Sequence, residues 1–217
     1  MAPLNHKAIL ALAALLFQCR QSVGQHLRAR YGAPDPYTSD SCGKPIWASV
    51  DSGSPLPDRA FAAGFDRYIC DGTICGRDLY VSLISDHGGR FTGKTWFQRE
   101  DACSNSIIHG QSVVTKHDCR VLVMGSAQYG SLRFAWTAVS AYGNNQNIYD
   151  APAQAMTAGN NEGGPTYVCR FRTSSGDQIV GSTYFPRRDS FCCSAEFNGA
   201  EIRGSTCEVL ITEPCQT

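Results

Sequence analysis

The chain contains an internal repeat, and this limits its possible folds more than any other feature. Trp47-Ala-Ser-Val recurs 89 positions later as Trp136-Thr-Ala-Val, and the run that begins at Cys119 recurs 88 positions later at Cys207. The other matching pieces are Tyr80-Val81 with Tyr167-Val168, Gly93-Lys94 with Gly181-Ser182, and Cys103 with Cys192. Because one β-sheet face cannot bury itself, two copies of one unit are expected to pack on each other.

The local patterns predict strands rather than helices. Short runs rich in β-branched and aromatic residues are separated by Gly, Pro, Asn, Asp and Ser. The predicted strands are 46–50, 79–84, 112–116, 120–124, 131–140, 167–172, 178–185 and 206–212. We therefore predict an all-β fold, with two pseudo-symmetric β-sheet repeats packed into one compact, disulfide-stabilised domain.

The N-terminus is typical of a secretory signal peptide. Lys7 precedes an apolar run of about ten residues, and the small residues Ser22 and Gly24 follow it. The run is too short to span a bilayer, so no membrane span is expected. The alternative is a helix that packs on the domain. The predicted divisions are a signal peptide at 1–24, an arm at 25–46, repeats at 47–124 and 131–212, and a tail at 213–217.

Cysteine usage supports export. Cys19 lies in the predicted signal peptide, and the even number that is left predicts a disulfide framework in an extracellular protein. The cysteines of the mature chain are Cys42, Cys70, Cys75, Cys103, Cys119, Cys169, Cys192, Cys193, Cys207 and Cys215. Connectivity does not follow from spacing. One scheme that respects the repeat pairs 103 with 119, 192 with 207, 70 with 75, 42 with 215, and 169 with 193.

Several function classes find little support. Without the signal peptide the chain carries 17 basic and 19 acidic residues, and no basic stripe favours nucleic acid. No C-x-x-C pair or finger-like spacing indicates a metal, and no cofactor motif occurs. The sequence lacks H-E-x-x-H, G-x-S-x-G and a facing carboxylate pair, so we expect a protein that is not an enzyme.

The stretch from Ala62 to Lys94 carries the candidate binding site. It begins near Gly64-Phe65-Asp66, continues through a β-rich run, turns at 86–89 and ends with Gly93-Lys94. A strand followed by a reversal can bring Asp66 close to Lys94. A carboxylate that accepts hydrogen bonds and an ammonium that donates them can together hold the hydroxyls of a sugar.

The order and double occurrence of these pieces resemble the DM-nine repeat proteins of invertebrates. The resemblance rests on Trp47, Ala63-Gly64-Phe65-Asp66, Leu79-Tyr80-Val81, Gly93-Lys94 and Cys119-Arg-Val-Leu-Val, with their second copies. That family includes secreted mannose-binding lectins of innate immunity, with two repeats in one β domain. The resemblance implies that Asp66 and Lys94 bind the sugar and that glycans are the partners. A dimer or a dense glycan surface would then supply avidity.

The weaker candidates are Trp96, Asn161 and Ser182. Trp96 follows Lys94 closely and could stack on a sugar ring, whereas Trp47 and Trp136 are expected in the core. Asn161 and Ser182 stand where the first repeat has Asp66 and Lys94, so the second site is expected to be weaker. Each polar residue has an ordinary alternative: turn chemistry for Asp66 and a solvated side chain for Lys94. The alternative function is a secreted protein-binding effector or scaffold.

Overall fold

The structure is a computed structural model that describes residues 42–86, 89–96, 101–126, 132–140, 151–161, 164–185 and 191–215. The predictions for the signal peptide and for most of the arm lie outside these residues. The described residues form strands and connecting turns. The strands are β1 Pro45–Val50, β2 Ala62–Cys70, β3 Thr73–Asp86, β4 Gly89–Thr95, β5 Ser104–Ile108, β6 Gln111–Thr115, β7 Cys119–Met124, β8 Leu132–Ser140, β9 Thr157–Asn161, β10 Gly164–Arg172, β11 Gln178–Tyr184, β12 Cys193–Phe197, β13 Ala200–Gly204 and β14 Thr206–Pro214.

The strands fall into two halves with the same pairing pattern. In the first half β1 pairs with β7, β2 with β3, β3 with β4, β4 with β5, and β5 with β6. In the second half β8 to β14 repeat these pairings in the same order. The register repeats as well, because Ser82 faces Val121 as Cys169 faces Val209. The all-β fold with two pseudo-symmetric halves is thereby confirmed.

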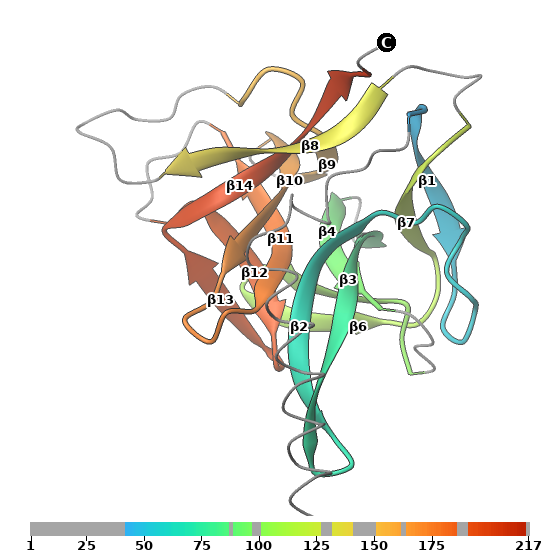
Figure 1. Cartoon of the computed structure of the whole chain (residues 1–217), viewed down its shortest axis with the longest axis vertical. Helices are drawn as coiled ribbons and strands as arrows, with labels where there is room; N and C mark the ends of the chain where they lie inside the picture. Colours follow the sequence, from blue (N-terminus) through green and yellow to red (C-terminus); the bar gives the residue numbers. More distant parts are fainter. Residues whose placement is uncertain are drawn as a thin grey trace, which may run out of the picture. The chain divides into compact units, whose positions relative to one another are not determined.

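Within the described strands, six close into a ring around the main core (Figure 1). Each half supplies three of them: β2, β3 and β4 from the first, and β9, β10 and β11 from the second. The halves join where β2 pairs with β11 and where β4 pairs with β9. The interior holds apolar side chains of both halves, among them Leu79, Val81, Val168 and Ile179, all fully buried.

Two glycines at equivalent positions allow the halves to meet at the two joints. A side chain on Gly64 would collide with the backbone carbonyl of Gln178, and one on Gly159 would collide with that of Arg90. Such close backbone approach is a common reason for glycine inside a strand. Gly64 therefore serves the joint between β2 and β11, beside the residues that the sequence indicated as functional.

Five disulfides occur in the described part of the chain, and they match the repeat-based scheme. Cys103 pairs with Cys119 and Cys192 with Cys207, at equivalent places in the two halves. The remaining bridges join Cys42 with Cys215, Cys70 with Cys75, and Cys169 with Cys193. The predicted disulfide framework is confirmed, and it covers both ends of the described domain.

The sequence patterns did not predict all of the strands. The predicted runs overlap β1, β3, β6, β7, β8, β10, β11 and β14, although residue 131 lies outside the described residues. Our prediction omitted β2, β4, β5, β9, β12 and β13. These strands carry glycines and charged residues, such as Asp66 and Lys94, that are rare in strands. The turn-like setting expected for Asp66 is wrong, because this residue lies inside β2.

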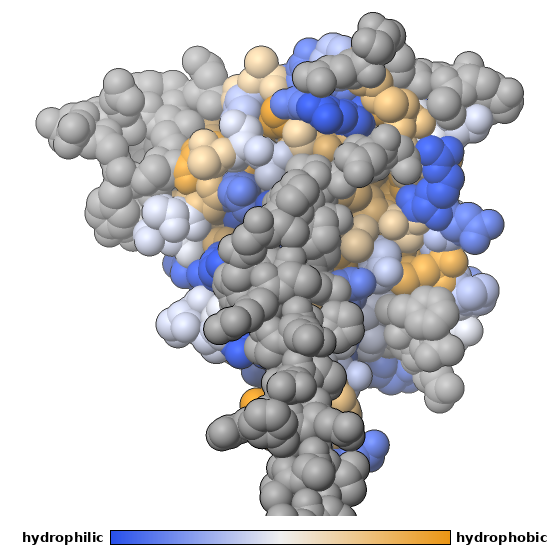
Figure 2. All heavy atoms as spheres, in the orientation of Figure 1, coloured by the Kyte–Doolittle hydropathy of each residue, from blue (hydrophilic) through white to orange (hydrophobic). Residues whose placement is uncertain are grey.

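The surface mixes polar and apolar residues. Figure 2 shows apolar residues in several separate areas between hydrophilic ones on one face. Among the residues that the structure describes, Ile69 and Ile74 are the most exposed large apolar side chains, at 80 % and 68 %. In the part of the chain that the structure covers, no helix has the length and apolar character needed to cross a membrane.

Candidate functional site

Asp66 and Arg77 form a partly buried ion pair across the hairpin of β2 and β3. The two residues face each other in the strand register, which places their side chains on the same side of the hairpin. Arg77 donates from Nε to Asp66 Oδ1 at 2.7 Å and from Nη2 to Oδ2 at 3.0 Å. This two-pronged contact fixes the plane of the Asp66 carboxylate, whose side chain is only 3 % exposed.

Lys94 on β4 forms a second ion pair, which is buried, with Glu196 on β12 of the other half. The Lys94 Nζ atom lies 3.3 Å from Glu196 Oε2, and both side chains are almost fully buried. The Glu196 carboxylate also accepts hydrogen bonds from Asn105 Nδ2 at 3.2 Å and from the Gly199 N–H at 2.6 Å. Because the buried charge has several partners, the cost of removing it from water is partly offset.

The two pairs form one electrostatic unit, the Asp66–Lys94 cluster, defined by Asp66, Arg77, Lys94 and Glu196. Burial lowers the pKa of Lys94, whereas the negative charges of Glu196 and Asp66 oppose this shift and Arg77 adds to it. Asp66 is therefore near enough to act on the Lys94 ammonium, although 27 residues separate them in the chain. Two acids and two bases leave the cluster without net charge.

Aromatic rings pack against the two cations of the cluster. Its exposed surface belongs to Arg77, and its other charged side chains are buried. The Arg77 guanidinium lies 3.7 Å from the Trp96 ring centroid and 4.8 Å from that of Tyr68. The Lys94 Nζ atom lies 5.3 Å from the ring centroid of Phe197. Arg77 is 26 % exposed and Tyr68 is 39 % exposed, whereas Asp66 and Lys94 are below 4 %. A ligand would meet Arg77 and Tyr68 before it could reach the acid and the ammonium.

The second half lacks this charged arrangement. Ser182 occupies the position of Lys94 and faces Ser194, as Lys94 faces Asn105. Asn161 occupies the position of Asp66, at the end of β9 opposite Gly164. The second half thus has an uncharged residue at each of these two positions, whereas Trp96 of the first half contacts the Asp66–Lys94 cluster through Arg77.

Sequence reasoning missed Arg77 and Glu196. A signal for Arg77 did exist: a two-residue turn at Asp71-Gly72 between Cys70 and Thr73 places Arg77 opposite Asp66 by counting along the hairpin. Glu196 carried no such signal. The equivalent position in the first half is Ile107, and only the packing of β12 near β4 and β5 brings Glu196 to Lys94.

The cluster combines the kinds of polar group that can bind hydroxyls. It holds guanidinium, ammonium and amide donors and carboxylate acceptors, which pair with one another in this structure, and Arg77 is its charged member with exposed surface. Among the residues that the structure covers, no group of three or more His, Cys, Asp or Glu side chains is placed to hold a metal ion. The role of Asp66 and Lys94 in sugar binding stays a prediction.

The comparisons with known proteins identify a similar fold. The crystal structure of the nematode sperm cell motility protein MFP2B superposes with a TM-score of 0.57 at 15 % sequence identity. The match covers 86 % of this chain and 51 % of that chain, so this chain spans about half the length of its structural neighbour. No family model matches the sequence. No curated protein matches it either.

Proposed function

We propose that this chain is an extracellular carbohydrate-binding protein of the mannose-binding type, with its sugar site at the Asp66–Lys94 cluster. The observation that carries the proposal is the meeting of two acids and two bases from both halves at one place. Two linked pairs with an amide beside them bring hydrogen-bond donors and acceptors together, and neighbouring sugar hydroxyls need both kinds of partner.

The exposed part of the cluster defines how a sugar would approach. Arg77 lies between Tyr68 and Trp96, and all three keep some exposed surface. An aromatic ring offers a flat apolar face for a pyranose ring, and the guanidinium offers donors to its hydroxyls. In this arrangement Asp66 orients Arg77, and Lys94 with Glu196 provides the charged floor of the site.

Two further observations support the extracellular lectin assignment. The order of motifs in both halves resembles the DM-nine repeat family, whose members include secreted mannose-binding lectins. The five disulfides of the described chain are typical of proteins that fold in an oxidising compartment. A few hydrogen bonds minus the cost of immobilisation give affinity of about 1 mM for one sugar. Glycan-rich surfaces or a homodimer would raise the apparent affinity.

A glycan array followed by titration with methyl mannoside tests the proposal. Asp66→Asn and Lys94→Met remove the buried charges, and Arg77→Gln changes the exposed part of the site with less risk to folding. We expect each variant to weaken mannoside binding at least about tenfold, because each loses a charge-assisted hydrogen bond.

The matched control is Arg133→Gln, which breaks the half-exposed pair of Arg133 with Glu213 on β8 and β14. This variant should bind as the parent does. Circular dichroism and thermal unfolding identify any variant that fails to fold. If folded Arg77→Gln and Lys94→Met proteins bind mannoside with the parental affinity, the assigned site is wrong.

A protein-binding function is the second candidate, and one observation favours it. Ten residues lie between the facing residues Asp66 and Arg77, but only two lie between their counterparts Asn161 and Gly164. The longer hairpin carries Ile69 and Ile74, which face each other and are highly exposed. Under this hypothesis Ile69→Ser/Ile74→Ser abolishes capture of a protein partner, and methyl mannoside does not compete with that partner.

A further inference from the structure

The two halves provide an internal comparison of the same position with different residues. Leu83 of β3 faces Arg120 in the ladder, and Arg170 of β10 faces Glu208 at the equivalent place. Leu83 and Arg170 are thus counterparts, as are Trp47 and Trp136 on β1 and β8. A comparison of the space beside Trp47 with the space beside Trp136 therefore indicates the effect of having leucine rather than arginine at this position.

In the second half, Arg170 fills the space beside Trp136. Its guanidinium carbon lies 4.1 Å from the centroid of the Trp136 ring. Nε donates to Glu208 Oε2 at 2.7 Å, and Nη1 donates to the Ala63 carbonyl at 3.4 Å. The Arg170 side chain is 1 % exposed. The face of Trp136 is therefore covered by a cation of the chain itself.

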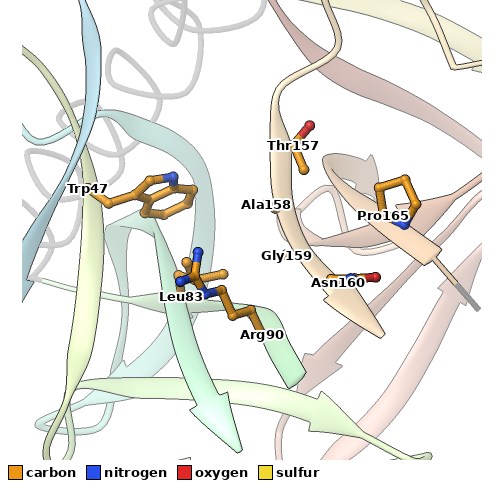
Figure 3. Close-up of a pocket in the computed structure, with 8 residues that line it drawn as sticks. All are labelled: Trp47, Leu83, Arg90, Thr157, Ala158, Gly159, Asn160 and Pro165. Carbon is orange, nitrogen blue, oxygen red and sulfur yellow. The ribbon is translucent and has the colours of Figure 1, made fainter. Parts of the chain in front are cut away.

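In the first half, the corresponding space is open. Leu83 is shorter than arginine and leaves a pocket of about 460 Å³ beside Trp47. Figure 3 shows Trp47, Leu83 and Arg90 on one side of the pocket, with Thr157, Asn160 and Pro165 across from them. Both halves thus line the pocket. Its size lies within the range of sites for small molecules, and a single sugar ring fits that range.

The polar groups of the pocket favour an anion. Arg90 on β4 is exposed, and none of the residues that the structure describes forms an ion pair with it. Its counterpart in the second half is the neutral Gln178. Arg120, which faces Leu83, adds a second positive charge where the second half has Glu208. None of the described residues that line the pocket is acidic, so the Arg90 guanidinium favours a negative charge there.

We propose that this space, the Trp47–Arg90 pocket, binds a sugar ring that carries a carboxylate, such as a uronic acid. The ring packs against the face of Trp47, and the carboxylate pairs with the Arg90 guanidinium. The Asn160 carboxamide and the Thr157 hydroxyl, on the opposite wall, bind the ring hydroxyls. The site is separate from the Asp66–Lys94 cluster, which supplies none of the pocket residues.

The direct test is titration of the full chain with methyl glucuronide and with methyl glucoside, which differ in the carboxylate. We expect the glucuronide to bind at least about tenfold more tightly, and to lose affinity as salt is added. Equal binding of the two compounds would overturn the role of Arg90. Absence of glucuronide binding would overturn the whole inference.

The chain itself supplies the variants. Leu83→Arg/Arg120→Glu copies the second half and should fill the space beside Trp47 with a paired arginine, and Arg90→Gln copies Gln178. Both should lower glucuronide affinity about tenfold or more, whereas the exposed Lys116→Gln is the matched control and should leave it unchanged. If the Leu83→Arg/Arg120→Glu protein, here called the pocket-filled variant, is folded and binds glucuronide with the parental affinity, the proposal is contradicted.

The same experiments separate this inference from the proposed mannose site. Asp66→Asn should leave glucuronide binding unchanged, and the pocket-filled variant should leave mannoside binding unchanged. If mannoside fails to bind and glucuronide binds, the Asp66–Lys94 assignment is wrong and the pocket stands. If Asp66→Asn, once shown to be folded, abolishes glucuronide binding, the two sites are not separate and the inference is overturned.

Discussion

At the scale of single residues, the main question is how buried charges are tolerated. Lys94 and Glu196 lie in the interior, yet each has an opposite charge within reach, and Asp66 is held by Arg77. An unpaired charge at these positions would destabilise the fold by several kcal/mol. Mutation of one partner therefore changes both stability and the candidate site, and each binding test needs a measurement of folding beside it.

The pH dependence of stability should report on Lys94. Burial lowers the pKa of Lys94 in the folded chain below the ordinary value of 10.5. Between the folded-state pKa and 10.5, the unfolded chain therefore binds more protons than the folded chain. The free energy of unfolding of the parent should thus rise relative to Lys94→Met as pH increases from 7 toward 10.5. Urea titrations at several pH values measure this difference. A flat or falling difference contradicts the burial of the charged amine.

Asp177 should show the opposite, acid-side behaviour. Burial raises its pKa, but hydrogen bonds from Ser175 and Arg67 outweigh this and lower the pKa below 3.8. The stabilisation is present above pH 3.8 and is lost as pH falls through the folded-state pKa. We expect Asp177→Asn to cost about 2 kcal/mol at pH 7 and much less near pH 2. Chemical unfolding at both pH values checks this, with Asp58→Asn as an exposed control.

At the scale of strands, equivalent positions of the two halves are joined by different kinds of contact. Cys169 on β10 and Cys193, the first residue of β12, form a disulfide, while their counterparts Ser82 and Ser104 form a hydrogen bond of 2.6 Å between buried hydroxyls. Both contacts fasten the third strand of a half to the fifth. The geometry of the first half is therefore close to that of a bridge.

This equivalence predicts that Ser82→Cys/Ser104→Cys forms a sixth disulfide in the described domain. The new loop spans 22 residues, and the chain-entropy model gives a gain of about 3 kcal/mol. Thiol counting and thermal unfolding, with and without a reductant, measure the outcome. The single variants serve as controls and should gain nothing. Two free thiols in the folded double variant would contradict the prediction, and would show that the side-chain geometry at these positions differs between the halves although the strand register is the same.

At the scale of the whole molecule, the disulfides should contribute unequally. The Cys42–Cys215 bridge closes 173 residues, whereas Cys70–Cys75 closes five. The chain-entropy model gives about 5 kcal/mol for the first and about 2 kcal/mol for the second. We expect Cys42→Ser/Cys215→Ser to lower the unfolding midpoint far more than Cys70→Ser/Cys75→Ser. Calorimetry on both double variants decides this, and equal losses would contradict the model.

Three of the five disulfide pairings did not follow from spacing, but the repeat and the local strand patterns were enough to predict the fold class and the two equivalent bridges, Cys103–Cys119 and Cys192–Cys207. They rest on short-range properties, namely β propensity, turn residues and the spacing of two copies. The strands that were missed, such as β2 and β4, contain Gly64, Asp66 and Lys94, whose chemistry suits a site more than a strand. Their strand conformation is fixed by neighbours that are distant in the sequence.

An even set of cysteines and a repeated β pattern are enough to predict a disulfide-bridged sheet structure in two parts. Which charges meet, in contrast, depends on the tertiary structure. Glu196 reaches Lys94, and Arg90 comes to line a pocket with Asn160, because β strands of one half pair or pack against those of the other. Contacts of this kind depend on the packing of surfaces far apart in the chain, which local residue patterns do not encode.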